Sequence, residues 1–382
     1  MRRKTYIYER PEWPRFEWAQ DRLAGALSAV HRDQGRLLGR MEALGFPLRQ
    51  EAQLTTLTED VVRSSEIEGE KLDRDQVRSS VARRLGIDVG GAKRAGRDVE
   101  GIVEMMLDAT REYGMPLTEE RICSWHASLF PTGRSGMQKI TAGAWRRYTR
   151  DPMQVVSGPV GKERVHFEAP PATRLGKEMG AFLRWMKDVP NAGADPILSA
   201  GIGHLWFVTI HPFEDGNGRI ARAITDMLLA RAEGSSQRFY SMSAQIQRER
   251  NAYYDILEAT QKGPLDVTPW LEWFLACLGR AIAGARTTLA SVLSKARFWQ
   301  MFGTIPINER QRHVINRLLD GNVDSSAAGR RAGKLTSAKW ATLTKCSHDT
   351  ALRDIQGLVE NGVLVRNPGG GRSTSYALKE LQ

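Results

Sequence analysis

Cysteine is scarce in this chain. The 382 residues contain only three cysteines, at positions 123, 277 and 346, and no two of them are close in sequence. A paired C-x-x-C arrangement is therefore absent, which argues against a disulfide framework and against a zinc or redox pair. Such cysteine usage is typical of a reducing compartment, so we expect a cytoplasmic protein.

Long hydrophobic runs are also missing. The most apolar stretch, residues 197–210, is shorter than the roughly 20 residues that cross a bilayer, and it includes His204. Residues 1–18 begin with basic side chains but contain no apolar segment of the kind found in secretory signals. We therefore expect no membrane partner. No internal repeat or low-complexity tract is visible either.

The overall composition is that of a globular protein. Hydrophobic residues make up 41% and charged residues 26% of the chain. At this length two or three domains are expected, since a single core rarely grows so large. The net charge of +11 is spread along the chain and favours acidic partners. ATP, an acidic protein surface and nucleic acid all meet that description.

Residues 211–222 read HPFEDGNGRIAR and concentrate the chemistry. Pro212 forces a turn after an apolar stretch, and the glycines at 216 and 218 allow positive φ angles that point backbone N–H groups into one hollow. A helix is predicted from Arg219 to Ala232, with its positive end facing that hollow. These features together predict a polyphosphate cradle with the His211 imidazole at its rim.

This stretch resembles the Fic family motif HPFx[D/E]GNGRxxR at every specified position. The resemblance implies a mainly helical catalytic core that transfers AMP from ATP to a Ser, Thr or Tyr hydroxyl of a target protein. His211, which titrates near neutral pH as a free imidazole, would be the base, and Asp215 would hold Mg²⁺. The predicted nucleotide contacts in the motif are Gly216, Asn217, Gly218, Arg219, Ile220, Ala221 and Arg222. Glu214 has no predicted role.

Gly218 also bears on the type of transfer. Doc-type relatives, which transfer phosphate, have Lys at this position, so Gly218 favours nucleotide transfer. UMP or another nucleotide remains an alternative to AMP.

A second segment, SSEIEG at residues 64–69, resembles the inhibitory signature [S/T]xxxE[G/N] of Fic proteins. Ser64 and Glu68 are four residues apart and share a helix face, and Gly69 is a natural helix stop. The predicted inhibitory helix covers about residues 53–69. The resemblance implies that Glu68 pairs with Arg222 and thereby makes ATP bind unproductively.

A β-hairpin flap is predicted at about residues 154–168, because two apolar runs flank glycines and a proline. In the Fic family this flap clamps the nucleotide and aligns the target peptide by strand addition. Carried over by position, the nucleotide contacts here are Val165, His166, Phe167 and Glu168. Tyr253 and Tyr254, with Gln261, resemble the adenine-side wall. Residues 143–146 resemble the segment that leads into the flap.

The C-terminal region predicts three helices and a hairpin, an order that resembles a winged helix. Predicted helices span 307–319, 336–343 and 347–360, and predicted strands lie at 363–365 and 375–378. Arg353, Arg366 and Arg372 would then line a DNA-facing side. A module that binds protein, or only packs, is the equal alternative.

The predicted fold class is therefore mainly α: a Fic-type helical core with a β-hairpin flap and a C-terminal winged-helix-like domain. The predicted divisions are 1–100, with the inhibitory helix, 101–300 for the catalytic core, and 301–382. Further helices are predicted at 16–44, 73–84, 96–114, 118–129, 173–187, 195–210, 248–260 and 268–301.

Two other functions compete with adenylyl transfer. One is a DNA-binding regulator whose core only senses a nucleotide, and the other is an enzyme that removes AMP with Glu68 orienting a water. The oligomeric state is open, a homodimer included.

Overall fold

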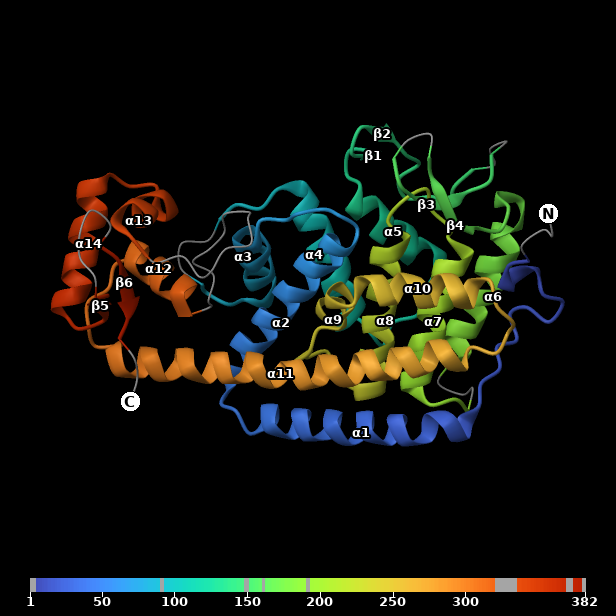
Figure 1. Ribbon diagram of the computed structural model, residues 1–382, viewed down its shortest axis with the longest axis horizontal. Coiled ribbons are helices and arrows are strands. Elements are labelled where there is room, and N and C mark those ends of the chain that lie inside the picture. The colour runs from blue at the N-terminus through green and yellow to red at the C-terminus, as the bar shows by residue number, and fades with distance from the viewer. Residues whose placement is uncertain are drawn as a thin grey trace.

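The computed structural model describes residues 5–89, 93–147, 151–159, 162–189, 193–319, 335–368 and 374–379. The described residues form mainly helices, with three separate pairs of antiparallel strands (Figure 1). None of the helices in these ranges is both long and apolar enough to cross a bilayer. The expected fold class, a mainly helical protein, is confirmed.

Two helices, α7 (Pro196–Ile210) and α8 (Asn217–Glu233), lie at the centre of the main hydrophobic core. Every α7 residue from Ile197 to Ile210 is buried, which explains why the sequence there is apolar on all sides. His204, the one ionisable side chain of α7, bonds to Thr225 of α8 and to Tyr253. Around this pair lie α4 (Arg97–Arg111), α5 (Glu119–Leu129), α6 (Leu175–Asp188) and α10 (Arg250–Gln261).

Two long helices lie along one side of this core. Helix α1 (Gln20–Glu42) packs along α11 (Thr268–Phe302), and the two run in the same direction (Figure 1). In α11, Trp270 and Phe274 are buried and Trp273 is partly buried, so these three aromatic side chains pack into the core. A bridge between Glu17 and Asp266 ties the segments that precede the two helices.

Helix α2 (Phe46–Ile67) crosses this arrangement and packs on α9 (Met242–Arg248), α3 (Arg74–Leu85) and α11. It begins seven residues before the predicted start at 53, with Pro47 in its first turn. Proline is tolerated there because the first N–H groups of a helix have no partner in the helix. The predicted helix 248–260 is α10, and the separate α9 that precedes it was not predicted.

Two hairpins stand on the face above α8 and α10 (Figure 1). One joins β1 (Arg134–Ser135) to β2 (Gln138–Lys139), and the other joins β3 (Gln154–Ser157) to β4 (Arg164–Glu168). The second hairpin is the predicted flap. Its base packs on the N-terminal segment, where Tyr6 and Tyr8 contact Phe167 near the short helix Ile7–Glu9. Another short helix, Ala172–Arg174, follows the flap.

The C-terminal part has its own core. It contains α12 (Glu309–Leu319), α13 (Ser337–Thr344), α14 (His348–Glu360) and the hairpin of β5 (Leu364–Arg366) and β6 (Tyr376–Leu378). Thr336 and Ser347 cap the last two helices, as the sequence indicates. Arg353 and Arg366 are exposed, whereas Arg372 lies outside the described residues. DNA binding by this part stays a prediction.

Candidate active site

The turn between α7 and α8 is built from two residues in the left-handed region. His211 has φ +52° and ends α7, with its N–H donating to the Phe207 carbonyl over 3.0 Å. Gly216 has φ +81° and precedes the first residue of α8. Gly218 does not have the expected positive φ, because it already lies in the first turn of α8. The free N–H groups at this helix start form an anion-binding end.

The side chain of Asn217 fixes the shape of this turn. It accepts from the Phe213 N–H over 3.0 Å and donates to the Phe213 carbonyl over 2.9 Å. Because Asn217 is buried and both ends of its amide are occupied, its side chain is not directed to a ligand. Only its backbone N–H is left for the predicted nucleotide contact.

His126 supports the turn from beneath, a role that its isolated position in the sequence did not indicate. Its ring stacks on Phe213 at 3.9 Å between centroids and lies 3.1 Å from the Asp215 carbonyl. The second ring nitrogen accepts from the Gly143 N–H over 2.9 Å. Burial lowers the pKa of His126 to about 4, so the ring is neutral at physiological pH.

His211 is half-buried, and its ring borders a cavity. Its Nδ1 lies 3.3 Å from the Val208 carbonyl, which orients the ring with Nε2 as the remaining nitrogen. Burial, with a smaller effect from the Arg146 cation, lowers the pKa of His211 to about 4. The expected titration near neutral pH is therefore wrong, and the imidazole is a neutral proton acceptor over the physiological range.

Arg146 holds the turn from the flap side. Its Nε donates to the His211 carbonyl over 2.8 Å, and its own N–H donates to the Pro212 carbonyl over 2.9 Å. Burial lowers the pKa of Arg146 to about 10, which still leaves it charged. Arg146 belongs to the segment 143–146 that the sequence places before the flap.

The end of α2 lies against Arg222 of α8. Arg222 Nη2 is 2.8 Å from Glu68 Oε1, and the guanidinium also donates to the Ser64 hydroxyl and carbonyl over 2.9 and 2.8 Å. Gly69, with φ +87°, ends the segment as expected. A Cβ on Gly218 would lie only 2.1 Å from Glu68 Oε1, so the glycine permits this approach. The structure thus brings Ser64, Glu68 and Arg222 together.

Arg219, the other motif arginine, has a carboxylate partner that the sequence did not indicate. Its Nη1 lies 2.5 Å from Glu70 Oε2, and its Nη2 lies 3.8 Å from Asp215. The guanidinium also stacks over Phe130 at 5.0 Å. Arg219 borders a separate hollow of about 230 Å³, on the side of Glu70, and not the larger cavity next to His211.

Asp215 lies two residues before the start of α8. One oxygen accepts from the Gly216 N–H over 2.5 Å, and the other accepts from the Ser135 hydroxyl of the first hairpin. Its neighbour Glu214 instead accepts from the N–H and hydroxyl of Thr141, both over 3.1 Å.

A magnesium ion fits these surroundings in only one way. Among the described residues, no group of three or more His, Cys, Asp or Glu side chains could hold a metal. The Asp215 side chain is 41% exposed beside the anion-binding end of α8. It therefore suits an ion that takes one protein carboxylate and completes its shell with phosphate and water oxygens, as Mg²⁺ does.

The cavity next to His211 has a volume of about 670 Å³. Its walls come from the end of α2, the flap, the α7–α8 turn and α10. Of the predicted residues, those that line it are Glu68, His166, Phe167, His211, Gly218, Tyr253, Tyr254 and Gln261. Gln261 is buried, and its amide donates to the Thr209 hydroxyl over 3.3 Å.

Eight predicted nucleotide contacts are not among the residues that line this cavity: Val165, Glu168, Gly216, Asn217, Arg219, Ile220, Ala221 and Arg222. Val165 and Glu168 lie on β4 but do not border it. The side chains of Ile220 and Ala221 are fully buried in the core, and the Ile220 N–H already donates to the Gly216 carbonyl. The motif fixes the spacing of Ile220 and Ala221 along the chain, but α8 directs their side chains into the core and away from the cavity next to His211.

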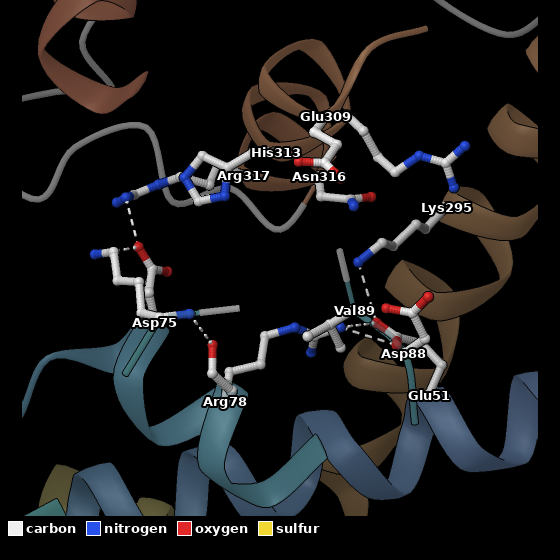
Figure 2. Close-up of a pocket in the computed structure, with 13 residues that line it drawn as sticks. Glu51, Asp75, Arg78, Asp88, Val89, Lys295, Glu309, His313, Asn316 and Arg317 are labelled. Atoms are coloured by element: carbon white, nitrogen blue, oxygen red, sulfur yellow. Dashed lines mark hydrogen bonds and ion pairs between the residues drawn. The ribbon is translucent and has the colours of Figure 1, made fainter. Parts of the chain in front are cut away.

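A second cavity, of about 330 Å³, lies away from the motif between the N-terminal helices and the C-terminal part (Figure 2). Arg317 of α12 pairs with Asp75 of α3 at 2.8 Å. On the opposite side, Glu51 of α2 receives Arg78 at 2.7 Å and Lys295 of α11 at 3.1 Å. Charges of both signs line this cavity, and we assign it no catalytic role.

Comparisons with known proteins agree with this geometry. Residues 116–229 match the family model described as Fic/DOC family, and residues 6–87 match a domain of unknown function, DUF4172. The protein adenylyltransferase Fic of Drosophila yakuba is 26% identical over 259 residues, which cover 67% of this chain and 45% of the relative. That of Nematostella vectensis is 35% identical over 119 residues, or 31% of this chain and 26% of the relative.

Solved structures show the same fold. A Fic family protein from Desulfovibrio desulfuricans G20 superposes with a TM-score of 0.53 at 20% identity, over 96% of this chain and 98% of that one. A Fic domain containing signaling protein from Bacteroides thetaiotaomicron gives 0.51 at 19% identity, over 69% and 97%. The chain spans less than half the length of the curated relatives described above.

Proposed function

Because residues 116–229 form a domain of the Fic/DOC family, we propose that this protein is an adenylyltransferase that moves AMP from ATP to a hydroxyl of a target protein. The carrying observation is that His211, Gly218 and the tyrosines of α10 border one cavity. The neutral imidazole can accept a proton from a hydroxyl, the start of α8 can bind a triphosphate, and the tyrosines can stack on a nucleobase.

In the proposed reaction, His211 takes the proton of the incoming hydroxyl, whose oxygen forms a bond to the α-phosphorus while pyrophosphate leaves. The N–H groups at the start of α8 hold phosphate oxygens, and Arg219 and Arg222 balance the charge of the leaving group. Asp215 would hold Mg²⁺. The ion, when bound, would neutralise phosphate charge.

We further infer that the protein is inhibited by its own α2 segment. Glu68 occupies Arg222 at 2.8 Å, and Glu70 occupies Arg219 at 2.5 Å. With both guanidiniums engaged, neither is available for the terminal phosphates of ATP. Glu68 and Glu70 are two residues apart, on either side of Gly69, and each pairs with one of the two arginines of the motif.

Replacing Glu68 tests this proposal. Glu68→Gly should raise AMP incorporation from labelled ATP at least tenfold, because Arg222 is released, and mass spectrometry of a treated lysate would identify the target. Adding His211→Ala should abolish transfer while ATP binding remains. Glu66→Gly is the matched control, since Glu66 lies in the same segment but, among the described residues, pairs with Arg63, at 2.6 Å, and not with a motif arginine. Equal labelling by the Glu66 and Glu68 variants would reject inhibition through Arg222.

Removal of AMP is the second candidate function. Glu68 borders the same cavity as His211, where its carboxylate could orient a water toward a modified hydroxyl. Purified protein incubated with a target that already bears AMP separates the two activities. Loss of AMP from that target by the unaltered protein, and not by the Glu68→Gly variant, would favour removal.

The three cysteines are free in the structure, and we propose a reducing compartment such as the cytoplasm for the protein.

A further inference from the structure

The hairpin of β1 and β2 projects from the helical core (Figure 1). Of its residues 134–139, all but Ser135 are exposed, and Met137 at the tip is 93% exposed. The Arg134 side chain is used within the hairpin, where it donates to the Met137 carbonyl over 2.8 Å. The chain becomes buried again only at Ile140. Burial of apolar side chains is therefore not what this hairpin contributes to the fold.

Ser135 is the residue through which the hairpin reaches the motif. Its hydroxyl donates to Asp215 Oδ2. Among the described residues, this is the only hydrogen bond or ion pair that joins a side chain of residues 134–139 to the rest of the chain. Successive side chains of a strand point to opposite sides, so Ser135 points inward while Arg134 points to solvent. The inward contact of the hairpin is thus made to the carboxylate that we propose for Mg²⁺.

The Asp215 carboxylate has an alternative partner close by. Its side chain is 41% exposed, and Arg219 Nη2 lies 3.8 Å from the same Oδ2 atom. Oδ1 accepts from the Gly216 N–H over 2.5 Å, a bond within the same turn. The Ser135 hydroxyl fixes the second oxygen and favours this orientation over one directed to Arg219. Because an ionised carboxylate offers about four lone-pair sites, Oδ2 can accept this bond and still bind an ion.

We propose that Ser135 is a positioning residue, whose hydroxyl holds the Asp215 carboxylate in the orientation that binds the divalent ion of the nucleotide. The inference rests on the proposed function, which supplies the metal-bound nucleotide. Hydrogen-bond partners of a ligating carboxylate fix its direction, and their loss weakens metal binding by about 10- to 100-fold. Ser135 acts on the ion through Asp215 and does not itself touch the reacting atoms.

Mn²⁺ binding tests the proposal without any need for transfer. This ion takes the same oxygen ligands as Mg²⁺, and its electron paramagnetic resonance signal reports the free ion. The full chain carrying Glu68→Gly is saturated with an ATP analogue that has a methylene group between the α- and β-phosphorus, and Mn²⁺ is titrated. Adding Ser135→Ala should raise the Kd for Mn²⁺ about tenfold. An unchanged Kd would overturn the inference.

Two further variants separate the hydroxyl from the fold of the hairpin. Ser135→Thr keeps the hydroxyl and should leave the Kd for Mn²⁺ within about threefold of the parent value. A loss as large as that of Ser135→Ala would show that the hydroxyl is not what matters. Thr141→Ala is the matched control, because it removes a hydroxyl that donates over 3.1 Å to the neighbouring carboxylate, Glu214. It should leave the Kd unchanged, and a loss equal to that of Ser135→Ala would reject a specific role for Ser135.

A combination with Asp215→Asn shows whether Ser135 acts through this carboxylate. Residues that act through one another have effects that do not add. Adding Ser135→Ala to Asp215→Asn should therefore weaken Mn²⁺ binding by less than about twofold more. A further tenfold loss in the combined variant would mean that Ser135 affects the ion independently of Asp215, contrary to the proposal.

Transfer kinetics provide a second readout. In Ser135→Ala, the Mg²⁺ concentration for half-maximal AMP transfer should rise about tenfold, while the rate at saturating Mg²⁺ stays within about threefold of the parent rate. A lower saturated rate with an unchanged half-maximal Mg²⁺ concentration would contradict a positioning role.

The outcomes also separate this inference from the proposed function. If Ser135→Ala weakens Mn²⁺ binding but no variant transfers AMP, the proposed function is rejected and the positioning role of Ser135 stands. If AMP is transferred and Mn²⁺ binding does not depend on Ser135, only the positioning role is rejected.

Discussion

His211 is the residue at which burial matters most for chemistry. The motif identifies His211 as the base, but from the sequence alone its pKa would be expected near the ordinary value of an imidazole. Its position beneath the flap and beside Arg146 lowers the pKa to about 4, so the imidazole needs no deprotonation before it acts.

The pH dependence of transfer should reflect this. A group whose pKa is lowered to about 4 stays in its neutral, active form as pH falls from 8 to 5.5. The maximal rate of the Glu68→Gly variant, followed by pyrophosphate release, should therefore stay level over that range. Removal of the Glu68 carboxylate can only lower the His211 pKa further. Thermal melting at each pH controls for unfolding, and a halving of the rate near pH 6.5 would contradict the prediction.

Asp215 and its neighbour Glu214 have different partners and should respond differently to substitution. In the Glu68→Gly background, Asp215→Asn should raise the Mg²⁺ concentration for half-maximal activity by about tenfold or more, because a hard anionic ligand is lost. Glu214→Gln, whose carboxylate contacts Thr141, is the matched control and should change this value by less than about twofold. Equal shifts in both variants would remove Asp215 as the metal ligand.

At the scale of single residues, the sequence predicted the contacts between residues that belong to the two signatures. It predicted the meeting of Ser64, Glu68 and Arg222 because each belongs to a signature. It missed Glu70 because that residue lies just beyond the signature, and only the path of the chain after Gly69 brings it to Arg219. It missed His126 because a single histidine with no motif spacing carries no signal.

At the scale of elements, most helices were predicted to within a few residues. Capping residues such as Thr118, Asp195 and Thr336 mark their starts, and the apolar periodicity marks their length. Short α9 was missed, since seven residues show too little periodicity. Helix α2 begins at Phe46, seven residues before the predicted start at 53.

One pair of helices is held unusually close. A Cβ on Gly101 of α4 would lie 1.7 Å from the Ser128 carbonyl oxygen of α5. Gly101→Ala should therefore lower the free energy of unfolding by about 1–3 kcal/mol, since the backbones of α4 and α5 must move apart to make room for the added methyl group. The measurement is equilibrium urea denaturation.

Gly25→Ala is the control for Gly101→Ala. Gly25 lies exposed in α1, with nothing within 4 Å of the added Cβ. It should raise the free energy of unfolding by about 0.5–1 kcal/mol, the usual preference of a helix for alanine. Stabilisation by both substitutions would mean that α4 and α5 are not in close contact.

At the scale of the whole molecule, the C-terminal part is held to the N-terminal helices by charged contacts. Arg317 of α12 pairs with Asp75 (Figure 2). Asp75 also pairs with Lys93 at 3.1 Å. The predicted division at residue 301 falls at the end of α11, whose residues Phe298 and Phe302 already belong to the C-terminal core. The helix is shared by both cores, which no local pattern in the sequence could indicate.

Weakening this contact should loosen α12 without unfolding the core. Asp75→Asn removes a partly buried ion pair worth about 1 kcal/mol, so amide exchange in residues 309–319 should become roughly fivefold faster. Hydrogen–deuterium exchange with mass spectrometry measures it. Asp349→Asn, on the exposed start of α14, should leave that exchange unchanged. Identical exchange in the unaltered protein and both variants would show that the ion pair does not hold α12.

The length of α11 has a mechanical consequence. Its 35 residues extend for about 50 Å, and one unbroken helix joins the aromatic side of the nucleotide cavity to the C-terminal core. A rod of that length magnifies rotation: a tilt of about ten degrees at Trp270 would carry the far end through roughly 9 Å. A partner bound to the C-terminal part could therefore displace α11, and the displacement would be transmitted to Trp270, which contacts His204 and Tyr253.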